Sequence, residues 1–132
     1  MVFFQGIDLL KIERIKKIYL NYSDRFLEKI LTNREIKQIK NHRQIYNKIA
    51  SKFSAKEAAS KALGTGISNG ITFKDFEILN ESNGSPKLKF YGVAKTKLKN
   101  LSSSSISITH DGEYIVSVVT LLLNDKWKKF LL

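Results

Sequence analysis

Four charged residues occupy positions where functional groups often gather, at the ends of predicted strands and on a helix with few bulky side chains. They are Asp8, Glu57, Lys61 and His110. Carboxylates are the ligands that a hard divalent cation prefers, and a lysine beside them suits the oxygens of a phosphate group. Each of the four residues could also have a purely structural role, and the surrounding sequence helps to decide between the two.

Asp8 follows an apolar segment, Val2–Ile7, which predicts a short strand, and precedes a helix predicted to begin at Leu10. An aspartate just before a helix commonly serves as its N-cap, because the carboxylate accepts a free backbone N–H of the first turn. The sequence alone leaves Asp8 open between a functional carboxylate and a helix cap.

Glu57 and Lys61 are four residues apart on a helix predicted from about Ile45 to Leu63. An isolated pair with this spacing is usually a surface ion pair worth a few tenths of a kcal/mol. Here the helix is bare, so a ligand or another stretch of backbone can approach it closely. Its small residues are Ala55, Ala58, Ala59 and Ala62.

The helix is predicted to end at Gly64, and the following loop contains Gly66. The loop amides either lie against a phosphate group or merely end the helix and form a turn. His110 ends a strand predicted from Ser105 to Thr109, beside an Asp111-Gly112 hairpin turn. An exposed turn histidine is the ordinary interpretation of that position.

The remaining pattern predicts helices in the first half of the chain and strands in the second. Apolar residues from Leu10 to Tyr19 have helical spacing, Ser23 can cap a short second helix, and Thr32 with Glu35 forms a capping box. The later predictions are a bulge or bend near Lys74 and Asp75, a strand at 86–90, a helix at 91–101, a polar stretch at 102–105 and a strand at 114–123. Residues 1–132 are therefore expected to form a single α+β domain, with helices packed on an antiparallel sheet.

Composition narrows the classes of function. The 132-residue chain has 23 Lys and Arg against 12 Asp and Glu, a net charge of +11 that favours a polyanionic partner. It has no cysteine, which excludes disulfides, thiolate metal sites and cysteine nucleophiles. No signal peptide and no apolar run of membrane-spanning length is evident, so we expect a cytoplasmic protein. The basic and aromatic tail at 125–132 is expected to be loosely held.

Five segments in this order resemble the holo-acyl-carrier-protein synthase family of phosphopantetheinyl transferases: GIDLLKIERI, FLEKILTNRE, KFSAKEAASKALGTGI, FKDFEILNESNGSPKL and SISITHDGEYIVSVV. They cover residues 6–119. The resemblance implies a phosphopantetheinyl transferase-like fold and a Mg²⁺-dependent reaction for fatty acid biosynthesis. In that reaction the 4′-phosphopantetheine of coenzyme A passes to a serine of an acidic apo-acyl carrier protein, and 3′,5′-ADP leaves. It also implies a homotrimer with the active site between neighbouring subunits.

The resemblance further implies roles for individual residues. Asp8 and Glu57 correspond to the metal carboxylates, and Lys61 and His110 complete the catalytic set. The expected coenzyme A contacts are Lys52, Lys61, Gly64, Gly66, Pro86 and His110, and the expected carrier-protein contacts are Arg14, Arg25 and Lys29. The chain departs from the family at Lys52, where arginine is common, and at Ser85, where a lysine often precedes the proline.

Two other functions fit parts of the pattern. A basic domain that binds nucleic acid would account for the charge, but the sequence has no helix-turn-helix, aromatic RNA-binding or zinc-finger signature. A metal-dependent nuclease would use Asp8, Glu57 and Lys61. The order of the five segments favours the transferase, acting on coenzyme A and a carrier protein without a nucleic-acid or membrane partner.

Overall fold

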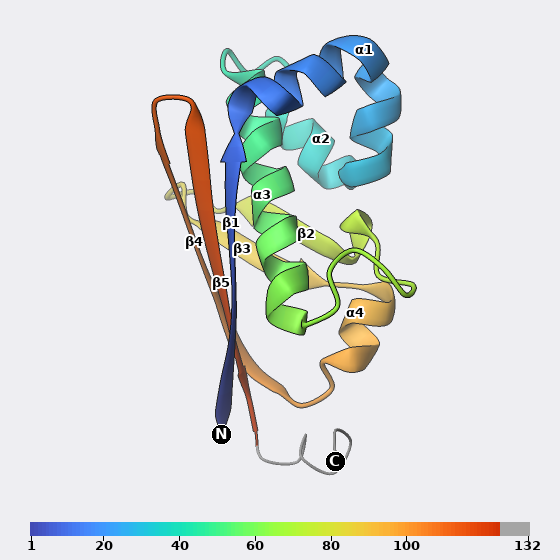
Figure 1. Cartoon of the computed structure of the whole chain (residues 1–132), viewed down its shortest axis with the longest axis vertical. Coiled ribbons are helices and arrows are strands. Elements are labelled where there is room, and N and C mark those ends of the chain that lie inside the picture. The colour runs from blue at the N-terminus through green and yellow to red at the C-terminus, as the bar shows by residue number, and fades with distance from the viewer. Residues whose placement is uncertain (125–132) are drawn as a thin grey trace.

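A computed structural model of the chain describes residues 1–124. One long antiparallel sheet has the order β1-β5-β4, and a smaller antiparallel sheet pairs β2 with β3 (Figure 1). The strands are β1 (Val2–Lys11), β2 (Phe76–Asn80), β3 (Pro86–Phe90), β4 (Leu101–Asp111) and β5 (Tyr114–Leu123). The helices are α1 (Ile12–Ile30), α2 (Asn33–Ile39), α3 (Ile45–Leu63), α4 (Gly92–Lys97) and a 3-10 turn, η1 (Phe73–Asp75).

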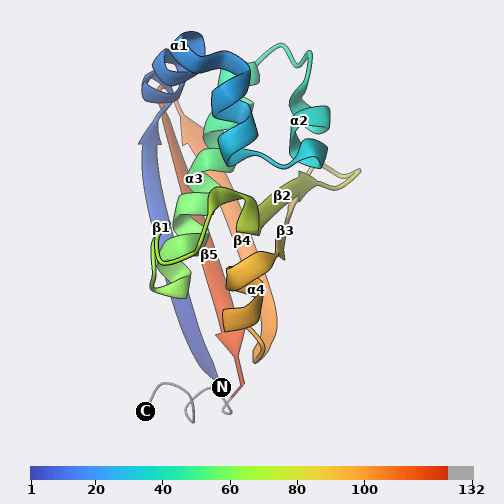
Figure 2. The ribbon, with the colours of Figure 1, turned by 90° about the vertical axis from the view of Figure 1, so that its right-hand side faces the viewer.

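Helix α3 runs along one face of the long sheet, and α1, α2 and α4 lie on the side of α3 that faces away from this sheet (Figures 1 and 2). The small sheet contacts α3 and, through β3, strand β4. Strand β5 is buried at every second residue, from Ile115 to Leu123, which is the period expected of a strand with one covered face. The alanines of α3 pack against this face and are fully or almost fully buried.

Strand β1 comes closest to α3 at Gly6. A Cβ atom at this position would lie 1.9 Å from the carbonyl oxygen of Ala58 and 2.5 Å from the amide nitrogen of Ala62. The backbones of the strand and the helix therefore touch directly, and only glycine fits between them. The bare helix face that the sequence predicted is the surface that accepts this strand.

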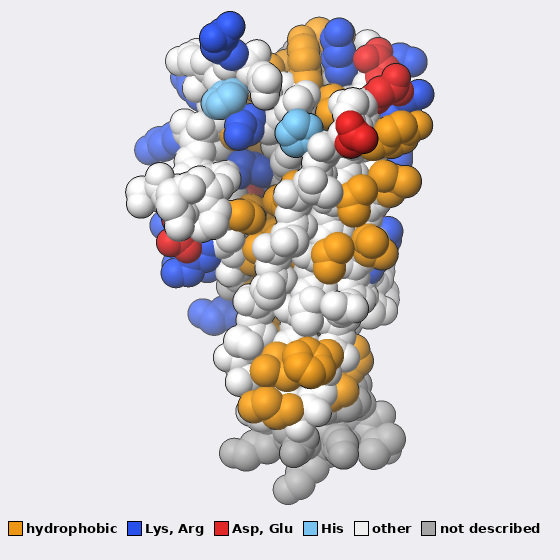
Figure 3. Space-filling model, turned by 90° about the vertical axis from the view of Figure 1, so that its left-hand side faces the viewer, with side chains coloured by type: hydrophobic (Ala, Val, Ile, Leu, Met, Phe, Trp, Pro, Cys, Tyr) orange, Lys and Arg blue, Asp and Glu red, His pale blue; other side chains and the backbone are white. Residues whose placement is uncertain are grey.

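The other face of the long sheet is apolar and uncovered. Phe3, Ile7 and Leu9 on β1 are 61–67% exposed, and Tyr114 on β5 is also exposed. Figure 3 shows this face, with hydrophobic side chains spread over the strands. Among the described residues, no helix packs on it. Exposed apolar side chains on a sheet face, here next to the exposed serines of β4, are typical of an interaction surface.

Several predicted elements are confirmed. α3 spans Ile45–Leu63 and ends at Gly64 in the left-handed conformation, with φ 86°. Thr32 and Glu35 form the full capping box at the start of α2. The strands at 86–90 and 114–123 have the predicted bounds, and the α+β class is correct.

Other boundaries were wrong. β1 continues to Lys11 because it pairs with β5 along its whole length, up to the pair Lys11–Tyr114, so α1 begins at Ile12 rather than Leu10. Asp8 therefore lies inside a strand and is not a helix N-cap. The predicted division at Ser23, in contrast, is confirmed, because its non-helical φ of 44° separates two helical stretches within α1.

The second half of the chain also differs from the prediction. The bulge or bend expected near Lys74 is a bend, the 3-10 turn η1, whereas the expected helix at 91–101 is shortened to α4. The polar stretch 102–105 belongs to β4, an edge strand whose serines are exposed. Serines give no apolar alternation on such an edge, which is why the strand looked short in the sequence.

None of the helices within residues 1–124 combines the length and apolarity needed to cross a membrane. The tail at 125–132, predicted to be loosely held, lies outside the described residues.

The contact at Gly6 generates a prediction. Gly6→Ala should lower the free energy of unfolding by about 3 kcal/mol, because its Cβ meets backbone atoms that cannot rotate away. The melting temperature should fall by roughly 10 °C. The exposed neighbour Gln5 provides the control, since Gln5→Ala should change stability by only about 0.5 kcal/mol. A Gly6→Ala protein that melts at the wild-type temperature would contradict the contact.

Candidate functional site

Asp8 lies two residues after Gly6, so the strand–helix contact brings its side chain to α3. The Lys61 ammonium donates to Asp8 Oδ1 at 3.2 Å and to the Ile7 carbonyl oxygen at 3.0 Å. Lys61 thus connects α3 to β1, and no ion pair joins it to Glu57 among the described residues. The ordinary surface-pair explanation of Glu57 and Lys61 was wrong.

Glu57 is half-buried on the same side of α3. Burial raises the pKa of its carboxyl group, and the negative charge of Asp8 raises it further. The positive charges of Lys61 and Arg14 act in the opposite direction but do not cancel the shift. These interactions place four charged groups from β1, α1 and α3 in one neighbourhood.

The raised pKa of Glu57 has a consequence for stability. Its native state holds a proton more tightly than the unfolded state, so the metal-free chain becomes less stable as the pH rises from about 4.5 through the raised pKa. At neutral pH the ionised Glu57 therefore costs stability. A carboxylate with this cost beside a second carboxylate is typical of a site that a cation completes.

The donor set fits a magnesium ion held together with a substrate. The described residues contain no cluster of three or more His, Cys, Asp or Glu side chains that would form a closed protein cage. Mg²⁺ is usually held by one or two carboxylates, with water and substrate phosphates completing its coordination. Asp8 and Glu57 supply such a pair.

The glycine loop after α3 ends the helix, which is one of the two roles expected from the sequence. The amides of Thr65 and Gly66 donate to the Ser60 carbonyl oxygen, and the Gly64 amide donates to that of Lys61. These N–H groups close the end of the helix, so they are not free to hold a phosphate group. A side chain at Gly64 or Gly66 would meet open space within 4 Å, so both positions lie on open surface.

Three of the expected coenzyme contacts lie apart from Asp8 and Glu57. Lys52 is 3% exposed, and its ammonium donates to the Ile78 carbonyl oxygen inside the protein. Burial lowers the pKa of Lys52 to about 8. The expected surface contact by Lys52 thus disagrees with its position, because its ammonium faces the interior.

Pro86 begins β3 in the small sheet, and the exposed His110 is on β4, separated from β1 by β5. Neighbouring strands are about 4.8 Å apart, so the backbones of β1 and β4 are roughly 10 Å from each other. A single chain therefore does not bring His110 to the Asp8 carboxylate.

A pocket beside α1 collects two of the three expected carrier contacts. It has a volume of about 440 Å³, and Arg25 and Lys29 lie at its rim. Its apolar lining includes Phe26, Phe53 and Phe73, with the last two rings stacked at a centroid distance of 5.1 Å. The pocket therefore combines an aromatic lining with positive charge.

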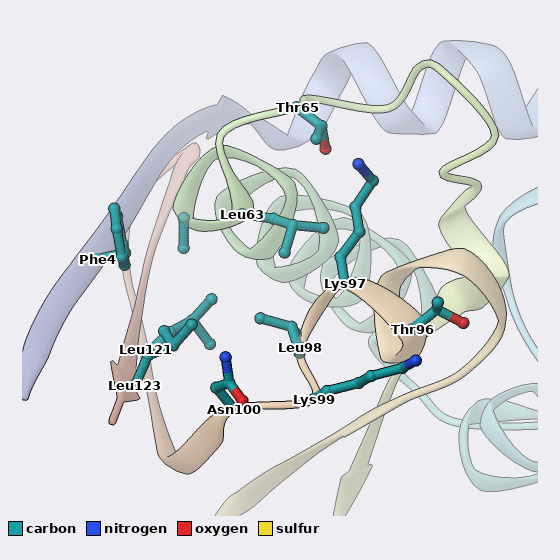
Figure 4. Close-up of a pocket in the computed structure, with 11 residues that line it drawn as sticks. Phe4, Leu63, Thr65, Thr96, Lys97, Leu98, Lys99, Asn100, Leu121 and Leu123 are labelled. Carbon is teal, nitrogen blue, oxygen red and sulfur yellow. The ribbon is translucent and has the colours of Figure 1, made fainter. Parts of the chain in front are cut away.

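A second cavity of about 470 Å³ lies at the opposite end of α3 (Figure 4). Phe4, Leu98 and Leu121 line its apolar part, and Lys97 reaches toward Thr65 across it. The described residues that line it include no carboxylate and none of Asp8, Glu57 and Lys61.

Comparison with known proteins identifies the family. Residues 5–119 match the 4′-phosphopantetheinyl transferase superfamily. The chain belongs to this superfamily. A holo-[acyl-carrier-protein] synthase of Buchnera aphidicola is 46% identical over 118 residues, covering 86% of this chain and 92% of the relative. The enzyme of that name from Aliivibrio salmonicida is 42% identical over 117 residues, covering 89% and 93%.

Solved structures agree with the fold of this transferase. The holo-[acyl-carrier-protein] synthase of Neisseria meningitidis has a TM-score of 0.80 and 29% identity, covering 90% of this chain and 97% of the other. That of Helicobacter pylori, solved in complex with coenzyme A, has a TM-score of 0.80 and 33% identity, covering 89% and 99%. The resemblance seen in the sequence is confirmed.

The sequence analysis of the transferase missed two buried polar features near the site. Glu35 and Lys56 form a fully buried ion pair at 2.6 Å, and the Ser117 hydroxyl, buried opposite Asp8, has no hydrogen-bond partner within residues 1–124. The signal for Lys56 was present, since it shares a helix face with Lys52 and with buried alanines. A lysine on such a face is buried rather than solvated.

Proposed function

We propose that this transferase is a holo-[acyl-carrier-protein] synthase. It moves 4′-phosphopantetheine from coenzyme A to a serine of apo-acyl carrier protein, giving holo-acyl carrier protein and 3′,5′-ADP. The observation that carries the proposal is the convergence of Asp8, Glu57 and Lys61 across the Gly6 contact, in a chain whose relatives have this name. A nuclease or a non-catalytic nucleic-acid binder gains no support from those relatives.

The side chains suit the transfer of a phosphoryl-linked group from the bridging oxygen of a pyrophosphate to a serine oxygen. The serine hydroxyl oxygen attacks the β-phosphorus of coenzyme A, and the bond from that phosphorus to the bridging oxygen breaks as 3′,5′-ADP leaves. Glu57, a half-buried carboxylate next to Asp8 and Lys61, would accept the serine proton. Lys61 uses two of its three N–H donors on Ile7 and Asp8, which leaves one for a phosphate oxygen.

Magnesium dependence is part of the proposal. Asp8 and Glu57 would hold the ion, which supplies charge neutralisation at the pyrophosphate when it is bound. The support is that Asp8 lies close enough to Glu57 for its charge to add to the rise in the pKa of Glu57 that burial causes. Coenzyme contacts by Lys52, Gly64, Gly66 and Pro86 stay predictions from the family resemblance, with Lys52 the least supported.

We also propose that the carrier protein docks along α1. Arg14 is exposed and close enough to Glu57 to lower the pKa of that carboxyl group, so a carrier bound there lies beside the reaction centre. Arg25 and Lys29 border the aromatic pocket farther along the helix. An acidic helix with an apolar face is complementary to this combination.

A homotrimer would account for two further features. The uncovered apolar face of the long sheet, with Ile7 and Leu9 exposed, would be buried by neighbouring copies. His110, remote from Asp8 within one chain, would then contribute to the site of a neighbour. A cytoplasmic location for the reaction stays a prediction.

The direct test is to incubate the chain with coenzyme A, Mg²⁺ and an apo carrier protein and to weigh the carrier. We expect the carrier to gain one phosphopantetheine group, and chelation of the metal to stop the gain. Asp8→Ala and Glu57→Ala should each lower turnover by at least about 100-fold, because several kcal/mol of charge stabilisation are lost.

Stability separates this loss from misfolding. At pH 7 the metal-free Glu57→Ala protein should melt at or above the wild-type temperature, because the ionised Glu57 is a cost in the native state. Glu13→Ala, an exposed change on α1, is the control and should keep full turnover. Near-normal transfer by folded Glu57→Ala protein would rule out the metal assignment.

The docking proposal predicts the effect of Arg14→Glu. Reversing this exposed charge should raise the KM for an acidic carrier at least about 10-fold, while the KM for coenzyme A changes less than about twofold. Moderate salt should weaken the wild type in the same direction, since exposed charges are screened over about 10 Å at 0.1 M. Lys37→Glu on α2 makes the same charge change elsewhere and should have little effect. If Arg14→Glu keeps the wild-type dependence on carrier at both salt concentrations, α1 is not the docking site.

The trimer proposal predicts the mass of the particle in solution. Light scattering should give the mass of three chains. Leu9→Glu should yield monomers with little activity, because it puts a charge on the sheet face that neighbouring copies would bury in the trimer. Leu20→Glu, at a leucine of α1 that is also 60% exposed, should remain trimeric. A wild-type monomer with full activity would refute the assembly.

A further inference from the structure

Lys56, on the helix that carries the reaction centre, forms a buried ion pair with α2 and a hydrogen bond to the end of the proposed docking helix α1. The Lys56 ammonium on α3 pairs with Glu35 Oε1 at 2.6 Å, and both side chains are completely buried. The same ammonium donates to the carbonyl oxygen of Ile30, the last residue of α1, at 2.6 Å. Lys56 is directly followed by Glu57.

The glutamate of the pair is itself fully held in place. Glu35 Oε1 also accepts the Thr32 amide, and Glu35 Oε2 accepts the Ile78 amide, each at 2.8 Å. The end of α1, the start of α2, the middle of α3 and strand β2 therefore meet at one point. Burial lowers the pKa of Lys56, and the Glu35 charge raises it in partial compensation.

Stability alone is a weak explanation for this arrangement. Removing two charges from water is costly, and well-packed apolar residues often replace such a pair without loss. The pair does, however, fix how the end of α1 is oriented and how far it lies from α3, because the Lys56 ammonium caps the Ile30 carbonyl group at the negative end of α1. Its geometry is more restrictive than an apolar contact of the same size.

The capped segment is the part of α1 that follows the break at Ser23. It carries Arg25 and Lys29, which border the aromatic pocket. Lys56 holds this segment from one side, while the adjacent Glu57 faces the reaction centre. A shift of the segment would move a docked carrier relative to Glu57, and a displacement of about 1 Å can cost 100-fold in rate.

We propose that Lys56, held by Glu35, is a positioning residue that sets the carrier-docking segment of α1 at the correct distance from the catalytic carboxylates. The inference rests on the proposed function. It predicts a specific kinetic signature: the carrier still binds and coenzyme A still binds, but the serine is misplaced and the chemical step slows.

The test uses the double variant Glu35→Gln/Lys56→Met. It removes both charges of the pair and the donor to Ile30, while the carboxamide oxygen keeps an acceptor for one of the two amides, of Thr32 and Ile78, that Glu35 accepts. We expect kcat per coenzyme-binding site to fall at least about 10-fold, with the carrier KM within about threefold and the dissociation constant of coenzyme A within about twofold of wild type. Lys56→Arg is the second variant, and its longer planar group should displace the end of α1 and lower kcat by about threefold or more.

Leu98→Ala is the control for stability, since it opens the core at a buried residue outside the proposed binding and catalytic groups. It should lower the melting temperature but keep wild-type kcat per coenzyme-binding site. Either Lys56 variant, folded and with wild-type kcat, would overturn the positioning role, as would a kcat loss equal to that of Leu98→Ala. If the wild type adds no mass to the carrier, the proposed function fails and this inference falls with it.

Discussion

The site exists because a strand and a helix meet at Gly6 with no side chain between them. The backbone of β1 lies against Ala58 and Ala62 of α3, and the next inward-facing residue of β1 is Asp8. Lys61, one turn beyond Glu57, then reaches the strand and donates to Ile7 and Asp8. A larger residue at Gly6 would separate the two elements and, with them, the two carboxylates.

This geometry trades stability for function. Two carboxylates share a half-buried place, which raises the pKa of Glu57 and makes its ionised form a cost at neutral pH. Lys61 and Arg14 offset part of that cost. Lys56, the residue before Glu57, is fully buried, and its charge is compensated by the buried carboxylate of Glu35. Three hydrogen bonds to backbone groups, those of Thr32, Ile30 and Ile78, hold the pair in place. Charge concentrated in this way lowers stability at neutral pH, and the rest of the core must compensate for it.

Local signals in the sequence were reliable where a single residue determines the backbone. Gly64 marks the end of α3, and Thr32 with Glu35 marks the start of α2. Long-range pairing determined what local signals did not: Asp8 lies inside a strand because β5 continues to Tyr114, and the serines of β4 form a strand because β5 pairs with them. The helix face shared with buried alanines indicates that Lys52 and Lys56 are buried, but their partners, the carbonyl oxygens of Ile78 and Ile30, depend on how β2 and α1 pack around α3.

The most direct test of the central claim is to locate a divalent cation in crystals of the chain grown with coenzyme A and Mn²⁺, whose anomalous scattering identifies it. The account predicts one metal ion at coordination distance from a carboxylate oxygen of Asp8 and one of Glu57, and from the pyrophosphate of coenzyme A. A metal ion bound elsewhere, with coenzyme A in place and Asp8 still paired only with Lys61, would contradict it.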